Sequence, residues 1–536
     1  MACCIIKPMN SLNKTAHSRA RPDPAGDALP PPVQPREAEI IQLTKLIDSQ
    51  KLTIHSQDIK IQALVQEVAY LRRIRYGTKS EAMSAVQRQL FEDDIVQDVA
   101  AVEAELKLPA TPATPRSRAG RQALPEHLLR VEVRHEPESC TCPACQANLI
   151  KIGEDVSEQL DIEPARFFVI RHIRPQYACR QCETVTAAAV APAVIDGSLA
   201  APGLLTWVAI SKYMDHLPLY RLEQIAARQQ VSLSRSTMSE WIGRMGFALQ
   251  PLADRLMEML KERQVLHADE TPVKQLDPGA GKTKRAYLWS YRSNDLDTGP
   301  PIVVFDYQSS RAGQHARDFL QDWQGSLMVD DYGGYKKMFA GDAKCIVIEL
   351  GCWAHARRKF FDLQVSGTHR SAAEALRRIG TLYAVEEAAR AMDHANRALH
   401  RQTNSLPILE EMHEWLIRLR ISTADGSGLA RAIDYTLNRW ASLVRYAHTG
   451  NLPIDNNPVE NAIRPIALGK KNWLFAGSER AGKRAAAIQS LFATAKLNGI
   501  EPAAWLKDTL EKLPVWNMRR IDELLPIKPM AQIPSD

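Results

Sequence analysis

Three acidic residues lie where strands and helices could bring their carboxylates together. Asp269 ends an apolar run at 265–268, and Asp330 ends a second run at 326–329. Glu460 comes much later, directly before a stretch rich in Lys and Arg. Mg²⁺ prefers one or two carboxylates with water and phosphate oxygens, and two such ions ~4 Å apart can activate a hydroxyl and stabilise a leaving oxygen in phosphodiester chemistry. We therefore predict a magnesium site formed by these three acids, although each alone is more often a capping or solvated carboxylate.

Cysteines suggest a second kind of site, because five of the nine lie between residues 140 and 182. Four of them form two C-x-x-C pairs: Cys142, Cys145, Cys179 and Cys182. Two such pairs suit a tetrahedral, closed and structural Zn²⁺ site. A strand at 167–170 could form a hairpin that brings the pairs together, and Cys140 is a spare or alternative ligand. Disulfides are the alternative, which the absence of a secretion signal disfavours.

The acids require a core that positions them, and the chain between 264 and 353 predicts one. Strands are expected at 265–269, 286–291, 302–306, 326–330 and 345–350, with a helix at 311–323 and another from Trp353. Acids at the ends of the first and fourth strands, in this order of elements, are typical of a ribonuclease H-like core. The 130 residues between Asp330 and Glu460 exceed what such a core needs. We therefore expect a helical insertion at about 361–450 in a multidomain α/β protein.

The charge of the chain is concentrated in one place. The 536 residues include 68 Lys and Arg against 62 Asp and Glu, a net charge of +6. Residues 461–496 contain seven basic residues and one acid, so this stretch carries the whole net charge. Such a surface predicts a polyanionic partner, with DNA the leading candidate, and a solvated basic helix face is the alternative. The expected DNA contacts are Arg464, Lys470, Lys471, Arg480, Lys483 and Arg484.

The N-terminal part predicts an oligomer. Residues 1–37 are rich in Pro, Ala and Arg and are expected to be disordered. A heptad pattern within 38–104 places β-branched residues in one column and mainly Leu and Gln in the other, which favours a parallel coiled coil and a homodimer or higher oligomer. A lone amphipathic helix is the alternative. A linker rich in Pro and Arg follows at 105–125.

Two helices within 198–260 form a further module. A helix at 219–227, a break at 231–234 and a second helix from Arg235 give a helix-turn-helix-like pattern, which many helical bundles share. The remaining boundaries that we expect are 126–197 for the zinc ribbon, 261–496 for the catalytic core and 497–536 for a C-terminal segment. No apolar run approaches the ~20 residues that cross a bilayer, so a membrane protein is excluded.

Several segments resemble the insertion sequence 66 family of DDE transposases. The resemblance is carried by HADETPV at 267–273, VDDYGGY at 329–335 and DNNPVE at 455–460. It continues through 463–465 and GKKNWLFAGS at 469–478, includes the heptads and cysteine pairs, and spans roughly residues 40–515.

The resemblance implies an enzyme that binds terminal inverted repeats, cuts 3′ ends and joins them to target DNA. Asp269, Asp330 and Glu460 would be its catalytic triad with Mg²⁺ or Mn²⁺, and Cys352 and His355 match a C-x-x-H signature whose role is catalytic support or structural. Because Asp331 directly follows Asp330, the choice of the second metal ligand between them is open.

The protein would be bacterial and cytoplasmic, nucleoid-associated on DNA, and could work with accessory proteins of its element. A dimeric, zinc-dependent DNA-binding regulator without catalysis is one alternative. A metal-dependent nuclease without strand transfer is the other.

Overall fold

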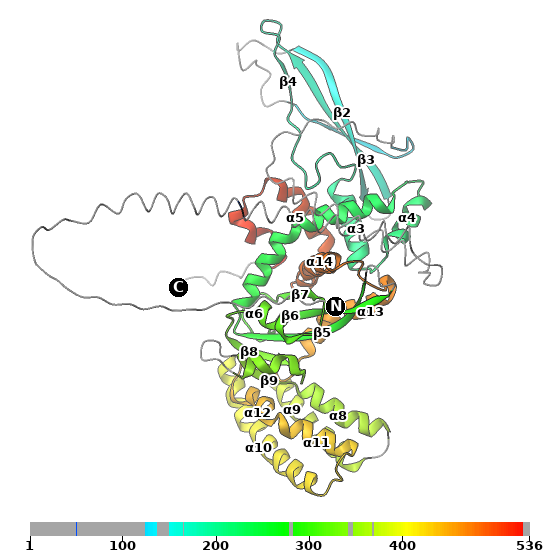
Figure 1. Cartoon of the computed structure of the whole chain (residues 1–536). Helices are drawn as coiled ribbons and strands as arrows, with labels where there is room; N and C mark the ends of the chain where they lie inside the picture. The colour runs from blue at the N-terminus through cyan, green and yellow to red at the C-terminus, as the bar shows by residue number, and fades with distance from the viewer. Residues whose placement is uncertain are drawn as a thin grey trace, which may run out of the picture. The chain divides into compact units, whose positions relative to one another are not determined.

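The computed structural model describes residues 124–136, 150–163, 166–277, 282–340, 347–366 and 369–528, together with Gln50 (Figure 1). All of these except Gln50 belong to one compact unit, residues 59–536. The predictions for residues 1–37 and for the coiled coil and linker at 38–125 lie almost entirely outside the described residues. So do the sites of Cys140, Cys142 and Cys145.

A small sheet precedes the helices. Its strands are β1 (Arg130–Arg134), β2 (Ile150–Glu163), β3 (Arg166–Ala178) and β4 (Val185–Ala187). β2 and β3 form a long antiparallel hairpin, and the strand predicted at 167–170 is confirmed as part of β3. Ile150 pairs with Ala178, the residue directly before Cys179. The hairpin therefore brings the second cysteine pair beside a strand that starts five residues after Cys145 in the sequence.

Three helices follow: α3 (Pro202–Tyr213), α4 (Leu219–Arg228) and α5 (Arg235–Lys261). The two helices predicted at 219–227 and from Arg235 are confirmed. Ser234 caps α5 by accepting a hydrogen bond from the backbone N–H of Thr237 at 3.1 Å. α5 is 27 residues long, and its buried face includes Trp241, Met245 and Leu249. This helix is therefore mainly a core element.

A five-stranded mixed sheet forms the centre of the fold (Figure 1). Its strands are β5 (Val265–Leu276), β6 (Thr283–Ser293), β7 (Val303–Gln308), β8 (Gly325–Val329) and β9 (Val347–Gly351). The order across the sheet is β7-β6-β5-β8-β9, with β6 antiparallel to both β5 and β7, and β8 and β9 parallel to β5. α6 (Gly313–Leu320) connects β7 to β8, while η2 (Gly333–Tyr335) and α7 (Lys336–Phe339) lie between β8 and β9.

All five predicted strands are present, but the first is longer than expected. Asp269 was predicted at the end of its strand, yet β5 continues to Leu276. The reason is its unequal neighbours: β8 pairs with β5 only over residues 265–267, whereas β6 stays paired from Leu266 to Leu276. Asp269 therefore lies just beyond the point where β8 ends, on a strand that continues as a two-stranded ribbon.

Helices occupy the stretch between β9 and the segment that carries Glu460. They are α8 (Trp353–Ser366), α9 (Arg370–Ala388), α10 (His394–Ile421), α11 (Gly428–Asn438), α12 (Trp440–Val444) and η3 (Arg445–His448). Their apolar faces share a core with Val265, Met328 and Leu350 of the sheet. This is the region where the sequence predicts helices, and it attaches to the edge of the sheet formed by β8 and β9.

The chain then returns to the sheet through α13 (Asn457–Trp473) and α14 (Glu479–Leu497), which is followed by α15 (Pro502–Lys512), η4 (Leu513–Val515) and η5 (Met518–Leu524). α14 packs on β7 and α5 (Figure 1). Phe305 donates its backbone N–H to Ser490 Oγ at 2.7 Å, so α14 is bonded directly to the sheet. None of the helices in the described part of the chain is long and apolar enough to span a membrane.

Candidate active site

The register of two parallel strands brings Asp269 and Asp330 side by side. His267 of β5 pairs with Met328 of β8; two residues further along the chain from each are Asp269, still on β5, and Asp330, which directly follows β8. Asp269 Oδ1 accepts the backbone N–H of Glu270 at 2.8 Å, and Asp330 Oδ1 accepts that of Tyr332 at 2.9 Å. Each carboxylate is thus oriented by its own backbone, and each keeps a second oxygen for another partner.

Glu460 lies in the first turn of α13, so a helix supplies it, as predicted. Asp455 fixes the start of this helix: its carboxylate accepts the backbone N–H of Asn457 at 3.0 Å and the hydroxyl of Tyr383 at 2.8 Å. Pro458 occupies the first turn, where its missing N–H costs no helical hydrogen bond. The segment before Glu460 therefore specifies a helix start.

Asn456 ties this helix start to the sheet. Its side chain is 1% exposed, accepts from His267 Nδ1 at 3.0 Å and donates to the carbonyl of Ala268 at 2.9 Å. Its backbone N–H points to Cys352 Sγ at 3.2 Å. Asn456 thus bonds to the strand directly before Asp269, four residues ahead of Glu460. This role of Asn456 could not be predicted from the sequence, because no local pattern distinguishes it from its polar neighbours.

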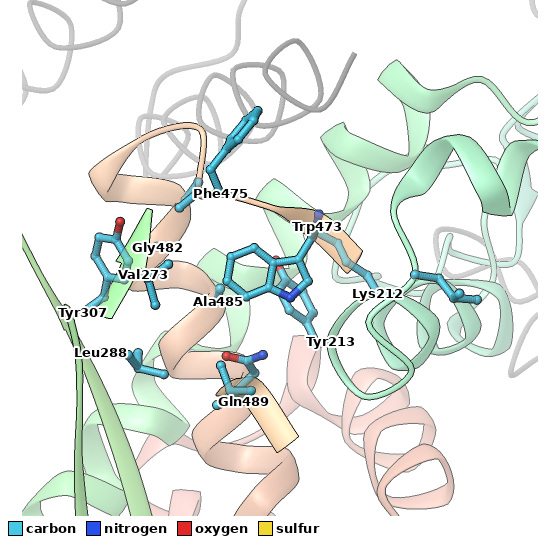
Figure 2. Close-up of a pocket in the computed structure, with 14 residues that line it drawn as sticks. Lys212, Tyr213, Val273, Leu288, Tyr307, Trp473, Phe475, Gly482, Ala485 and Gln489 are labelled. Carbon is cyan, nitrogen blue, oxygen red and sulfur yellow. The ribbon is translucent and has the colours of Figure 1, made fainter. Parts of the chain in front are cut away.

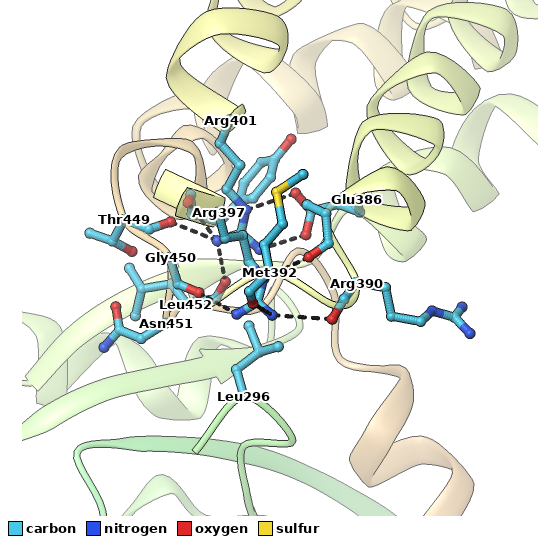
Figure 3. Close-up of polar contacts among 12 residues, drawn as sticks. Leu296, Glu386, Arg390, Met392, Arg397, Arg401, Thr449, Gly450, Asn451 and Leu452 are labelled. Carbon is cyan, nitrogen blue, oxygen red and sulfur yellow. Dashed lines mark hydrogen bonds and ion pairs between the residues drawn. The ribbon is translucent and has the colours of Figure 1, made fainter. Parts of the chain in front are cut away.

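A buried arginine holds the loop that precedes this segment (Figure 3). Arg401 of α10 is 0% exposed, pairs with Glu386 and donates to the carbonyls of Tyr446, Thr449 and Leu452 at 2.7–3.0 Å. The Arg401 guanidinium satisfies three carbonyls of the turn that leads toward Asp455. The helical region therefore positions the start of α13.

The electrostatics of the site favour a cation. The pKa of Asp269 is raised to about 7, first by burial and then by the carboxylates of Glu270, Asp330 and Glu460. Glu270 is paired with Arg311, with Nε to Oε1 at 2.7 Å, and accepts a hydrogen bond from the hydroxyl of Tyr335 at 3.0 Å. Among the described residues no basic side chain pairs with Asp269. Its hard oxygen donors and unbalanced negative charge fit Mg²⁺ or Mn²⁺.

Two neighbouring acids, Asp330 and Asp331, have different surroundings. Asp331 Oδ1 accepts from Arg439 at 2.8 Å, and the same guanidinium lies 2.9 Å from Glu349. Arg439 is 7% exposed and comes from the end of α11. Asp331 therefore has a fixed cationic partner, which leaves Asp330 as the better candidate for a metal ligand.

Cys352 and His355 lie next to Glu460. His355 Nδ1 is 3.7 Å from Glu460 Oε1. In the described ranges, the group of three potential metal ligands whose atoms all lie within 4.8 Å of one another is Cys352, His355 and Glu460, and the predicted triad does not form such a group. Glu460 is thus turned toward His355. Burial raises the pKa of the Cys352 thiol to about 12, which suits a packed thiol that accepts from Asn456.

The residues predicted to contact DNA differ in their solvent exposure. Arg464, Lys471 and Lys483 are exposed, and Arg480 is half-buried. Lys483 pairs with Glu479 of the same helix at 2.8 Å, an interaction that a surface position makes weak.

Two of the predicted contacts point toward the protein. Lys470 Nζ donates to the carbonyl of Pro272 at 2.9 Å, and burial lowers its pKa. The structure contradicts the prediction for Arg484, which is 5% exposed and packs so closely on α5 that a Cβ on Gly246 would clash with it. Arg484 lies on the same helical face as Ile488 and Leu491, the buried face of α14.

The described half of the predicted zinc site is a tight turn. Cys179 is buried at the end of β3 and Cys182 is exposed. The backbone N–H of Cys179 donates to Thr184 at 3.0 Å, and that of Glu183, which has a φ of 57°, donates back to Cys179 at 2.9 Å. This turn joins β3 to β4 and holds both cysteines at its start.

Models of known protein families match successive parts of this chain. Residues 197–484, more than half of the chain, match the transposase IS66 family, so the protein is a transposase. Residues 139–183 match the zinc-finger binding domain of transposase IS66, and 490–527 match the IS66 C-terminal element. Residues 63–133 match a model described as Transposase C of IS166 homeodomain. The chain belongs to the IS66 family, as the sequence predicted, and the zinc-finger match supports structural zinc.

Relatives match along nearly the whole chain. The uncharacterized protein y4qI of Sinorhizobium fredii is 36% identical and covers 91% of this chain and 93% of its own length. The uncharacterized protein y4jD of the same organism is also 36% identical, over 83% of this chain and 90% of its own. The similarity therefore includes the sheet, the helical region and the zinc-finger segment alike.

Proposed function

We propose that this protein cleaves the 3′ ends of its insertion sequence and joins them to target DNA, with Asp269, Asp330 and Glu460 as the catalytic triad. The observation that carries the proposal is the half-buried Asp269, which has no cationic partner among the described residues and lies beside Asp330, with Glu460 nearby at the start of α13. Neighbouring carboxylates without a cationic partner repel one another, and a role in binding a cation would explain why they lie together.

The topology of the sheet supports a ribonuclease H-like core. Three antiparallel strands, β5, β6 and β7, are followed by β8 and β9, which add in parallel on the other side of β5. In this arrangement the central strand, β5, carries the first acid, and the second directly follows its neighbour β8. The long helical region between β9 and α13 is then an insertion in that core.

Asp269 and Asp330 would hold Mg²⁺ or Mn²⁺, and Glu460 would exchange its contact with His355 for the ion. When bound, the metal activates the attacking hydroxyl and stabilises the leaving oxygen. The chain itself orients the carboxylates through backbone N–H groups and holds Glu460 in place through Asn456. Asp331 would not be a metal ligand, because it is paired with Arg439. Before the ion binds, His355 is a positioning residue for Glu460.

DNA binding would use the exposed basic residues Arg464, Lys471, Arg480 and Lys483 against phosphates. The zinc finger, with Cys142, Cys145, Cys179 and Cys182 as ligands, and the module of α3 to α5 would recognise the terminal repeats or scaffold the assembly. A coiled coil at 38–104 would join protomers, so that two DNA ends are held in one complex.

Strand transfer tests the proposal. A labelled duplex that carries the end of the element is incubated with plasmid, Mg²⁺ or Mn²⁺, wild-type protein and any accessory proteins of the element. We expect joined product with wild type and at least a ~10³-fold loss with Glu460→Gln, because one metal ligand is removed. Glu479→Gln, the same change in the first turn of the next helix, should retain joining.

Two results would contradict the proposal. If Glu460→Gln joined DNA as well as wild type, the triad would be wrong. If wild type nicked DNA without joining it, the protein would be a nuclease.

A further inference from the structure

A pocket lies at the far end of α13 from Glu460. Its walls come from α3, the sheet, the turn after α13, and α14 (Figure 2). We call it the Trp473 pocket and define it by Lys212, Tyr213, Tyr307, Trp473, Phe475 and Gln489. Val273 of β5 also lines it, four residues along the strand from Asp269. At ~3.3 Å per residue the pocket is about 13 Å from the proposed catalytic site and on the same face of the strand.

The aromatic wall depends on an uncommon turn. α13 ends at Trp473, and Leu474 adopts a φ of 66°, a conformation that non-glycine residues rarely take. The backbone N–H of Phe475 donates to the carbonyl of Trp473 at 2.8 Å, and that of Ala476 donates to Lys274 of β5 at 2.8 Å. The turn places Trp473 and Phe475 on the pocket, whereas the Leu474 side chain is 40% exposed. The strained residue therefore positions its two aromatic neighbours.

The aromatic wall has an open surface. No aromatic ring in the described chain stacks on Trp473, whose side chain is half-buried. Gln489, on α14, is 7% exposed, and the described residues provide no hydrogen-bond partner for its amide. Figure 2 shows both side chains among those that line the pocket. The pocket thus offers a ring face for stacking and an amide that can both donate and accept.

The size of the pocket restricts its ligand. Its cavity volume is about 60 Å³. Because ~10–15 Å³ of such volume holds one water, there is room for about four to six waters, which is the size of one planar ring system. A helix or strand of a partner protein does not fit in this space.

The charges around the pocket favour DNA. Lys212 lines the pocket, Lys471 lies in the last turn of α13 just before Trp473, and Arg480 directly precedes another lining residue, Ala481. Basic side chains around an aromatic wall are the combination that binds a phosphate backbone while stacking its bases.

We propose that the Trp473 pocket binds one unpaired nucleobase of the bound DNA. The base would be extruded from the duplex and stacked on Trp473, and Gln489 would be hydrogen-bonded to its edge. The inference rests on the proposed function for its ligand, since DNA must pass the catalytic site. Enzymes that act on DNA extrude bases into pockets of this kind, and the unpairing cost is lowest at a mismatch. An extruded base near the cleavage site would hold the DNA end in a defined register.

Binding to matched and mismatched DNA ends tests this. Duplexes with the end of the element, carrying a single mismatch at each terminal position in turn, are compared by fluorescence anisotropy. At one position wild type should bind the mismatch roughly ten-fold more tightly than the matched pair, since the unpairing cost is already met. Trp473→Ala should reduce this preference to less than about two-fold.

Two further variants make the test specific. Ala485→Phe fills the pocket while keeping Trp473, and it should abolish the preference as well. Leu468→Ala changes a side chain of α13 that is 60% exposed and not part of the pocket, and it should keep the preference.

Equal binding of matched and mismatched ends by wild type, or a preference that survives both pocket variants, would overturn the inference. Strand transfer by the same wild-type protein would leave the proposed function intact in that case. Failure of wild type to bind either duplex would contradict the proposed function as well.

Discussion

At the scale of single residues, the site depends on one half-buried carboxylate, Asp269, that pairs with no basic side chain among the described residues. Arg311 compensates Glu270, and Arg439 compensates Asp331. Burial, and then the like charges of Glu270, Asp330 and Glu460, raise the pKa of Asp269 to about 7, although its hydrogen bond from the backbone of Glu270 acts in the opposite direction. Asp269 therefore lowers the stability of the metal-free protein, and a bound divalent cation would restore that stability.

This gives a pH-dependent prediction for Asp269→Asn. The pKa of Asp269 is about 7 in the folded protein, against about 3.9 in the unfolded chain. The folded state therefore binds the proton more tightly, and this stabilising contribution is complete below about pH 4 and is lost as the pH rises to about 7. An Asn stays neutral. In metal-free buffer it should raise the free energy of unfolding at pH 8 by roughly 2–4 kcal/mol relative to wild type, with little gain at pH 4.

Urea denaturation at the two pH values measures the effect. Asp318→Asn, at an exposed position of α6, serves as the control and should change neither value. Adding Mg²⁺ at pH 8 should stabilise wild type more than Asp269→Asn. A variant that is less stable than wild type at pH 8 would contradict the account of this carboxylate.

At the scale of elements, the site is an assembly of parts distant in sequence. β5 and β8 supply two acids and α13 supplies the third, and Asn456 and Arg401 join them. Arg401 is suited to this role because a guanidinium presents five donors in a fixed plane, whereas an ammonium presents three without that geometry. The helical region thus contributes to the site by setting where α13 begins.

Arg401→Lys tests this contribution. The variant keeps the charge but cannot reach Glu386 and the three carbonyls together, so we expect a loss of about 2–4 kcal/mol in the free energy of unfolding. Arg390→Lys, which alters an exposed ion pair with Glu387 on α9, should cost less than about 0.5 kcal/mol. Urea unfolding of both variants makes the comparison, and equal losses would show that the buried cluster has no special role.

The strands and the family could be predicted from the sequence because apolar runs and long motifs are local signals. The extent of β5 could not, since it depends on β6, a partner whose turn and register come from elsewhere in the chain. Arg484 was misplaced for a related reason: counting charges does not tell which face of a helix each one occupies.

The polar residues that support the site could not be predicted from local sequence patterns. Asn456 meets His267 across 189 residues of sequence, and Arg439 meets Asp331 across 108. Such contacts exist only once the chain has folded, so the three acids could be identified from motifs while the groups that orient them could not.

At the scale of the whole molecule, the basic residues that account for the net charge of +6 lie on α13 and α14. Arg464, Lys471 and Lys483 are exposed there, while Arg484 is buried and Lys470 is bonded to β5. We therefore expect fewer phosphate contacts than there are basic residues on these two helices.

The salt dependence of DNA binding measures these contacts. Each phosphate contact contributes about −0.9 to the slope of log K against log salt. Arg464→Gln should therefore make the slope shallower by about one and weaken binding to all DNA sequences alike. Lys507→Gln removes an exposed charge on α15 and should leave the slope unchanged. The same decrease in both variants would indicate that the charge of the whole protein, and not this surface, attracts DNA.

The most direct test of the central claim compares the two adjacent acids, Asp330 and Asp331. Single-turnover cleavage of a labelled element end is measured with Mg²⁺ for Asp330→Asn and Asp331→Asn, after both variants are shown to bind that DNA like wild type. We predict at least a ~10³-fold loss of cleavage for Asp330→Asn, because it removes a metal ligand, and less than a ~10-fold loss for Asp331→Asn, which only weakens the contact with Arg439. Wild-type cleavage by Asp330→Asn, or the larger loss in Asp331→Asn, would contradict the proposed metal site.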